Sequence, residues 1–309
     1  MIGDGWSLRA LVRDGSDESN LTGLELELVR GDLLDPHIAP AMRGCDAVFH
    51  CAAHYSLWQR DRDTLYRSNV LGTRAVLGFA RAAGVPRVVY TSSVAAIGVK
   101  HGAIADERYQ APPGELIGAY KRSKYLAERA AFEAAAGGQD VVIVNPTTPL
   151  GPWDRKPTPT GEILVRFLNG RMPAYVDTAL NWVAVGDVAA GHLLAYEKGR
   201  SGERYILGGE NFPLHELLRR LGALTGRRPP QHRIPRRIPL VVAWVEEHVL
   251  AAFGYQPTVP LDGVRMSGEA MYYDSSKATR DLGYRPGPLE PALRAAIAWF
   301  AENGYIRSN

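Results

Sequence analysis

The 309-residue sequence contains little cysteine, no marked excess of charge of one sign and no long apolar run. Two cysteines, Cys45 and Cys51, fit a reducing compartment, and the apolar strand pattern around Cys51 predicts a buried thiol. A net charge of +3 without a basic cluster argues against nucleic-acid binding. We expect no integral membrane segment and a cytoplasmic location, because neither a bilayer-spanning run nor a signal-peptide pattern is found.

Other motifs are also missing. The eight histidines lack a metal-ligand spacing such as H-E-x-x-H, and the two cysteines form no C-x-x-C, so no metal site is expected. The G-x-S-x-G turn of serine hydrolases does not occur. The glycine-rich turn G-x-x-G-x-x-G, which binds the pyrophosphate of dinucleotides, is absent near the N-terminus.

Strand and helix patterns nevertheless alternate through the first half of the chain. This alternation predicts a Rossmann-like, doubly wound α/β fold with a parallel sheet covered on both faces. We expect a dinucleotide-binding domain over residues 1–150, to which residues 182–208 return, and a smaller C-terminal substrate lobe formed by residues 151–181 and 209–309. The expected strands of the first half are residues 7–13, 24–32, 46–53, 87–93 and 140–146.

The strand Ser7–Arg13 raises a question about what precedes it. A strand that ends in arginine usually comes second in a dinucleotide-binding fold, yet only six residues precede Ser7. A first βα unit of roughly 25 residues is therefore absent from this sequence. We expect exposed apolar sheet edges on both sides of the gap. We hypothesise that Met1 is an internal methionine or a misassigned start.

The strongest chemical signal is the stretch AYKRSKYLAE. Tyr120 and Lys124 are four residues apart in a helical pattern, so they share one face of the helix. A lysine ammonium beside a tyrosine stabilises the phenolate and lowers its pKa toward neutrality. Thr91, Ser92 and Ser93 end an apolar strand upstream, where a hydroxyl could bind a substrate oxygen. The alternatives are a solvated helix face and a simple turn.

Taken in order, these motifs resemble the extended short-chain dehydrogenase/reductase family, also called the NAD-dependent epimerase/dehydratase family. Within it the sequence looks similar to the dihydroflavonol-4-reductase-like branch, which includes hopanoid-associated sugar epimerases; SLW, KPTPTG, FLNGRMPAYVDT and ERYILGGEN suggest this branch. The matching motifs along the chain are GDLLD, HCAA, SNVLGT, YTSSVAAIG, YKRSK, NPTTPLGP and LGYRP.

The resemblance implies three catalytic residues. Ser93 would bind the substrate oxygen, Tyr120 would be the general acid/base, and Lys124 would bind the nicotinamide ribose and tune Tyr120. It also implies that Asn69 is structural. The cofactor-binding positions that it implies, besides Tyr120 and Lys124, are Arg13, Asp32, Leu33, Ala52, Ala53, Thr91, Pro146, Thr147 and Thr148.

Arg13 stands where NAD-using members of the family usually have an acidic residue. An arginine suits a 2′-phosphate, so we expect NADP, with NAD possible. A solvated charge at the strand end is the alternative, and the neighbouring Asp14 complicates the choice.

Two departures from the family narrow the reaction. Two serines and Val94 follow Thr91 in place of the dehydratases' Thr-Asp-Glu, which argues against dehydration. The arginine that nucleotide-sugar members carry before the strand at ALNWVAV is missing, which argues against a nucleotide-diphosphate sugar, although other arginines could substitute. We expect an apolar or aromatic substrate, with candidate contacts at Tyr55, Trp58, Trp153 and Tyr175. About half of such aromatics should instead belong to the core.

The sequence leaves three alternative functions open. The first is an NAD(P)-dependent oxidoreductase that interconverts a secondary alcohol and a ketone. The second is a sugar epimerase of the hopanoid-associated type, and the third is a catalytically silent dinucleotide-binding protein or truncated gene product. A homodimer is possible. The apolar helix pattern from Ile238 to Tyr255 predicts either packing of the smaller lobe or a lid or membrane-surface contact.

Overall fold

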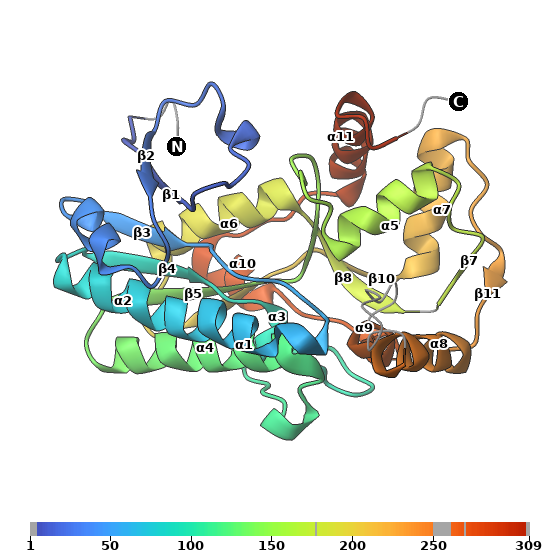
Figure 1. The fold of residues 1–309 in the computed structure, drawn as a ribbon, viewed down its shortest axis with the longest axis horizontal. Helices are drawn as coiled ribbons and strands as arrows, with labels where there is room; N and C mark the ends of the chain where they lie inside the picture. Colours follow the sequence, from blue (N-terminus) through green and yellow to red (C-terminus); the bar gives the residue numbers. More distant parts are fainter. Residues whose placement is uncertain (1–4, 177, 250–260, 269, 307–309) are drawn as a thin grey trace.

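The computed structural model describes residues 5–176, 178–249, 261–268 and 270–306 (Figure 1). Its main sheet contains four parallel strands in the order β3, β4, β5 and β9. This confirms the predicted parallel α/β architecture. The bounds of these strands are β3 Ala47–His50, β4 Arg87–Thr91, β5 Val141–Pro146 and β9 Arg204–Leu207.

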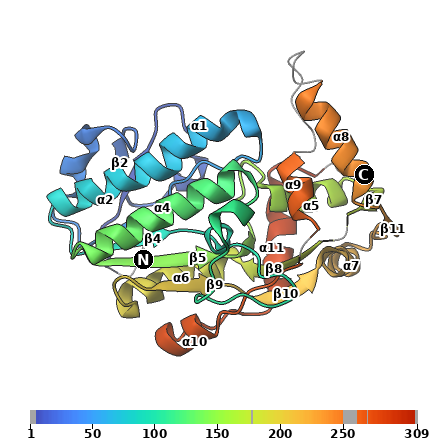
Figure 2. The same cartoon turned by 90° about the horizontal axis from the view of Figure 1, so that it is seen from below.

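Helices cover both faces of this sheet (Figure 2). On one face, Val88 and Tyr90 of β4 pack with α2 (Gly72–Ala82) and α4 (Gly118–Ala136). On the other, Val89 packs with α6 (Val185–Lys198) and α10 (Ser276–Leu282). Alternate residues of β4 therefore enter different cores, because successive side chains of a strand point to opposite faces.

The sheet is interrupted at its N-terminal side. Strands β1 (Arg9–Val12) and β2 (Glu27–Arg30) pair in parallel and form a separate two-stranded sheet. Leu11 and Leu28 are 37% and 40% exposed. On the other side of the interruption, β3 is only half-buried over residues 47–49, whereas β5 is buried throughout. The expectation of exposed apolar edges is therefore confirmed.

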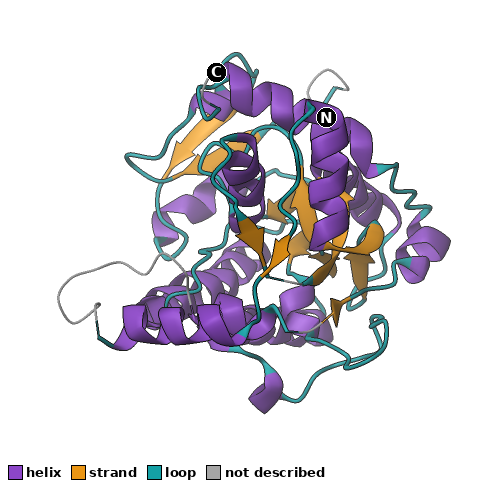
Figure 3. Cartoon of the chain, turned by 90° about the vertical axis from the view of Figure 1, so that its right-hand side faces the viewer, coloured by secondary structure: helices purple, strands orange, loops and turns teal. Residues whose placement is uncertain are grey.

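The smaller lobe is built around a second sheet, in which β8 (Ala179–Ala184) lies between β10 (Glu210–Pro213) and β12 (Ala270–Met271). Strand β6 (Thr148–Leu150) also pairs with β8. Viewed from this end, helices surround the short strands (Figure 3). The helices that share its apolar core are α5 (Pro159–Leu168), α7 (Leu214–Thr225) and α11 (Leu289–Glu302).

One expectation about the lobes is wrong in part. Strand β9, within residues 182–208, does return to the main sheet beside β5. Residues 182–184, however, belong to β8 and the smaller sheet, where Trp182 pairs with Glu210. An apolar run predicts a buried strand but does not specify the sheet that the strand joins. The remaining lobe boundaries stay predictions.

Two helices, α8 and α9, lie at the edge of the smaller lobe. Helix α8 covers Arg237–His248 and packs against α9, Leu261–Met266. The rest of the apolar pattern predicted from Ile238 to Tyr255 lies outside the described residues beyond 249. Among the described helices, none has the length and apolarity needed to cross a membrane.

Candidate active site

Ser93 lies at the carboxyl end of β4, where the chain enters the short helix α3 (Val94–Ile97). It is the N-cap of that helix, and its Oγ accepts a hydrogen bond from the Ala95 amide at 3.1 Å. N-capping by serine satisfies an amide that has no partner within the helix. The cap fixes the position of the hydroxyl that the sequence singled out.

Tyr120 lies in the first turn of α4, where it is half-buried and its side chain lies beside Ser93. Burial raises the pKa of Tyr120 to about 12, and hydrogen bonding with Ser93 opposes this rise. The phenol therefore carries its proton at neutral pH. Gly118, just before it, has a φ of +84°, and a Cβ there would lie 2.6 Å from the Asp262 carboxylate. The start of helix α4 thus requires glycine.

Lys124 lies one turn after Tyr120 and is almost completely buried. Its Nζ donates to the Thr91 carbonyl oxygen at 2.8 Å and lies 5.1 Å from the centre of the Tyr90 ring. Burial lowers the pKa of Lys124 to about 8, while Glu128 opposes this shift. The ammonium ties helix α4 to the end of β4. The predicted lowering of the Tyr120 pKa is wrong for this ligand-free structure, because burial of the phenol raises that pKa instead.

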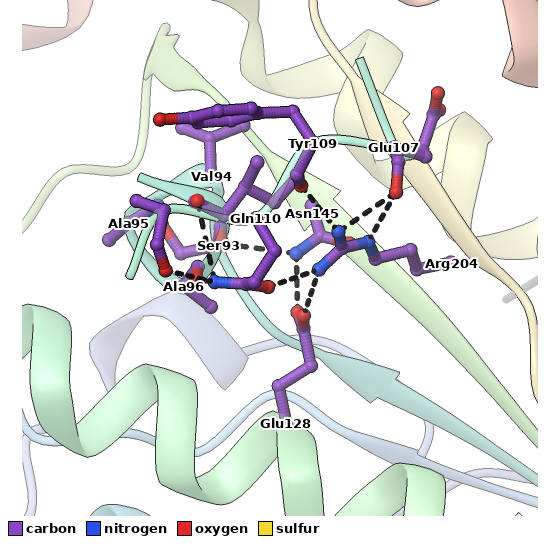
Figure 4. Close-up of polar contacts among 12 residues, drawn as sticks. Ser93, Val94, Ala95, Ala96, Glu107, Tyr109, Gln110, Glu128, Asn145 and Arg204 are labelled. Atoms are coloured by element: carbon purple, nitrogen blue, oxygen red, sulfur yellow. Dashed lines mark hydrogen bonds and ion pairs between the residues drawn. The ribbon is translucent and has the colours of Figure 1, made fainter. Parts of the chain in front are cut away.

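A buried polar network supports Ser93 from behind (Figure 4). Glu128, one turn beyond Lys124, accepts from Asn145 Nδ2 at 2.5 Å and from Arg204 Nη1 at 2.7 Å. Asn145 Nδ2 also donates to the Ser93 carbonyl oxygen at 3.0 Å. Arg204 Nη1 further binds Gln110 Oε1 at 3.0 Å. Helix α4, β5, β9 and the serine loop are therefore joined by one set of charged and amide groups.

The predicted adenine-side residues lie around the interruption of the sheet. Arg13 is exposed directly after β1, and Asp32 is exposed after β2, with its Oδ1 accepting from the Leu34 amide at 3.0 Å. Leu33 is half-buried, and Ala52 and Ala53 are exposed after β3. All of them follow the carboxyl ends of parallel strands, where ligands bind in open α/β folds.

Cys51 differs from its predicted burial. Its side chain is exposed, and Thr91 Oγ1 donates to its Sγ at 3.4 Å. The apolar strand pattern predicted burial because it assumed a neighbouring strand on that side of β3. In the described structure β3 pairs only with β4, so the residue that follows β3 stays open to solvent.

The nicotinamide-side candidates follow β5. Pro146 and Thr147 are buried and Thr148 is half-buried. The Thr147 amide donates to the Leu207 carbonyl oxygen at 3.2 Å, while its buried hydroxyl has no hydrogen-bond partner in the described structure. A buried polar atom without a partner in a ligand-free site is suited to a ligand hydroxyl or amide.

The four candidate substrate aromatics do not lie together. The Tyr55 ring is 4.5 Å from the Tyr120 ring, and the loop that carries it also contains Trp58, which lies under the Arg60 guanidinium. Trp153 is 62% exposed and lies 6.4 Å from the Trp299 ring, while Tyr175 packs on the core of the smaller lobe. Tyr55 is therefore the best placed of the four, and the substrate roles of the other three stay predictions.

Three features of the site were missed in the sequence: the π-helix at residues 66–71, His192 and Glu128. Residues 66–71 form a π-helix, and within it Asn69 accepts from the His54 amide at 2.7 Å and donates to Ser123 Oγ at 2.9 Å. Its side chain bridges the segments behind the site, as predicted from the resemblance. His192 Nε2 lies 2.8 Å from Thr91 Oγ1. No motif marks His192, whereas Glu128 could have been found from its spacing to Lys124.

Comparisons with known proteins agree with this geometry. The family model for the NAD-dependent epimerase/dehydratase family matches residues 1–208. A Synechocystis protein with the provisional name dihydroflavonol 4-reductase is 55% identical over 100% of this chain and 91% of its own length. Sterol demethylase protein B of Methylococcus capsulatus is 37% identical over 99% of this chain and 94% of its own.

A solved structure shares this fold. The crystal structure of gox2253 aligns with a TM-score of 0.87 at 44% identity, covering 98% of this chain and 93% of that one. Its similarity extends over both the Rossmann-like sheet and the smaller lobe. The chain belongs to the NAD-dependent epimerase/dehydratase family, that is, to the extended short-chain dehydrogenases/reductases.

Proposed function

We propose that this protein is an NADP(H)-dependent oxidoreductase that interconverts a secondary alcohol and a ketone, in the manner of a dihydroflavonol 4-reductase. One observation carries the proposal: the Tyr120 side chain lies beside Ser93 at the start of α4 and is followed one helical turn later by the buried Lys124. A protonated phenol beside a second hydroxyl is the pair that a carbonyl reduction needs.

In this proposal each side chain has a distinct task. The Ser93 hydroxyl binds the substrate oxygen and holds it next to Tyr120. Tyr120, protonated at neutral pH because burial raises its pKa to about 12, donates its proton to that oxygen as the carbonyl becomes an alcohol. In the oxidative direction the same oxygen returns its proton to Tyr120. Lys124 keeps the helix in register with β4 through Thr91.

The residues of the site suit a nicotinamide dinucleotide, which supplies the hydride when bound. Lys124 would hold the nicotinamide ribose, and the Thr147 hydroxyl, buried without a partner in the described structure, would meet a polar group of the cofactor. Asp32 would accept from the adenine amino group. Arg13 favours the 2′-phosphate of NADP over NAD.

An apolar or aromatic substrate fits this site better than a nucleotide sugar. Tyr55 places an aromatic ring directly beside Tyr120. The names of two relatives refer to a dihydroflavonol and to a sterol, neither of which carries a nucleotide. We also propose that the protein is cytoplasmic and forms a homodimer.

The test compares Tyr120→Phe with Tyr125→Phe, a control on the same helix. With NADPH and a panel of aromatic and polycyclic ketones, Tyr120→Phe should lower kcat by about 10²–10⁴-fold, because it removes the proton donor. Cofactor affinity, followed by quenching of protein fluorescence, should change little. Tyr125→Phe should leave both unchanged. A Tyr120→Phe variant with full activity would overturn the assignment.

The family also contains epimerases, which the same assay separates. An epimerase oxidises and re-reduces one carbon with a retained cofactor, so NADPH absorbance shows no net change during turnover. Consumption of NADPH in proportion to product supports the reductase. Turnover without consumption supports the epimerase.

A further inference from the structure

Helix α8 turns its apolar side to solvent. Ile238, Val241, Val242 and Val245 are between 36% and 64% exposed. Their spacing of i, i+3, i+4 and i+7 places them in one stripe, and Val249, also exposed, continues it. In a helix on the surface of a globular protein such a stripe normally faces the core. Here it points away from the protein, and Figure 2 shows α8 projecting from the body of the molecule.

The opposite side of α8 attaches it to the smaller lobe. Ala243 is fully buried, and it forms a small cluster with Leu240 and with Leu261 and Val264 of the α9 region. Glu246 is also buried on this side. The Glu247 carboxylate accepts from the Leu261 amide at 3.0 Å. Both carboxylates of the helix are therefore used on its inner side.

Aromatic and cationic groups border the outward stripe. Trp244 is 50% exposed and stacks on His248 at 4.9 Å between ring centres. Arg237, the first residue of α8, is exposed, and so is Arg233 four residues earlier. A cation in the first turn opposes the helix dipole, so helix stability does not explain Arg237. The exposed side of α8 combines branched aliphatics, one tryptophan and Arg237, and Arg233 lies in the short strand that precedes the helix.

We propose that α8 is a membrane-surface helix that inserts its aliphatic stripe between the headgroups of an anionic bilayer. Aliphatic side chains would enter the boundary of the acyl chains, Trp244 would lie at headgroup level, and Arg233 and Arg237 would meet lipid phosphates. The charges favour this occupant over a second copy of the chain. Within the described helix, Arg237 lies on the exposed side, whereas Glu246 is buried and Glu247 binds the Leu261 amide, so this side complements phosphates and not itself.

This surface is directly connected to the candidate active site. Asp262 of α9 accepts from Gln59 Nε2 at 2.6 Å, in the loop that also carries Tyr55. The same carboxylate lies against Gly118, two residues before Tyr120. Asp262 therefore links the region packed against α8 to the segments that carry Tyr55 and Tyr120. The binding of α8 to lipid stands independently of the proposed reaction.

The test is sedimentation of the full chain with vesicles, either of phosphatidylcholine alone or of equal parts phosphatidylcholine and phosphatidylglycerol. The protein should bind the mixed vesicles, less so at high salt, and pure phosphatidylcholine weakly. The double variant Val241→Ser/Val245→Ser should lose binding by about tenfold or more. The double variant Arg233→Gln/Arg237→Gln should lose about fivefold per arginine.

Matched controls lie on the exposed face of α4. Leu126 is 41% exposed and Arg129 is exposed, so Leu126→Ser and Arg129→Gln change the same residue classes elsewhere and should bind like the unsubstituted protein. Because the changed positions are exposed, circular dichroism should show unchanged folding. Trp244→Phe supplies a second readout: the shift of tryptophan fluorescence on adding vesicles should diminish in this variant.

Three results would overturn the proposal. One is a wild-type protein that binds neither kind of vesicle. Another is a valine double variant that binds like the wild type. The third is a wild-type dimer that ignores vesicles and dissociates on the Val241→Ser/Val245→Ser change in sedimentation velocity, which would make α8 an interface between two copies.

Discussion

The buried ion pair between Arg204 and Glu128 allows a quantitative test of how the site is held. Their side chains are 9% and 2% exposed, and Nη1 and Oε1 are 2.7 Å apart. Arg204 also donates to the carbonyl oxygens of Glu107 and Tyr109. Arg204→Met would remove all of these bonds while roughly preserving the volume of the side chain. The Glu128 carboxylate would then be buried without its cation.

Breaking a buried pair by removing one partner costs about 3–5 kcal/mol. We therefore expect Arg204→Met to lower the free energy of unfolding by this amount in urea titrations followed by circular dichroism. The double variant Arg204→Met/Glu128→Gln removes both charges and keeps an acceptor for Asn145, whose bond to Glu128 is 2.5 Å long. It should be more stable than Arg204→Met alone, with a coupling energy of up to about 3 kcal/mol.

An exposed pair serves as the control. Arg294 and Glu290 are 2.8 Å apart, but their side chains are 62% and 57% exposed. Arg294→Met should cost no more than about 0.5 kcal/mol, because solvent screens the pair and two flexible side chains must be ordered to form it. The reasoning would be refuted if Arg204→Met cost less than about 1 kcal/mol, or if the second substitution made the protein still less stable.

Three further predictions concern pH, reactivity and cofactor choice. Burial lowers the pKa of His50 from 6.5 to about 3. The free energy of unfolding should therefore fall by about 1.4 kcal/mol per pH unit as the pH drops from 6.5 toward 3, because the unfolded chain takes up a proton that the buried imidazole does not. In urea titrations between these limits, His50→Gln should lose less stability on acidification than the unsubstituted protein. The exposed Cys51 should react with iodoacetamide faster than the half-buried Cys45, as mass spectrometry of the labelled peptides would show. If the bound dinucleotide passes Ala52, NADP should slow the alkylation of Cys51. Equal rates with and without NADP would contradict this placement of the dinucleotide. In fluorescence titrations, Arg13→Ala should weaken NADPH binding by about tenfold or more, because a charge-assisted contact to the 2′-phosphate is lost. NADH binding should stay nearly unchanged. Equal losses of affinity for both cofactors would show that Arg13 does not select between them.

The sequence predicts the main sheet well because its strands are continuous apolar runs. Val141–Pro146 is buried on both faces, and such a strand is recognisable without knowledge of its neighbours. The pair Tyr120 and Lys124 could also be found from the sequence, because the two residues are only four positions apart. Both therefore depend on short-range patterns in the chain.

What the sequence did not reveal depends on contacts between distant residues. Arg204 is 76 residues from Glu128, and no periodicity connects the two. Strand β8 could have joined either sheet from its apolar pattern, and the exposure of Cys51 depends on which strands flank β3. The outward stripe of α8 has the same composition as a buried one. In these cases the tertiary arrangement decides, and local propensity does not.

The separate β1–β2 ribbon has a consequence for ligand affinity. Among the described residues this ribbon pairs with no further strand, and two-stranded units are marginally stable, so we expect it to open more readily than the four-stranded sheet. Arg13 and Asp32 follow its two strands, and in the proposed mode of cofactor binding both are in place only in molecules whose ribbon is closed. The apparent affinity is then the intrinsic affinity multiplied by the closed fraction. Whatever stabilises the ribbon acts, at a distance from the nicotinamide, as a positive effector of cofactor binding.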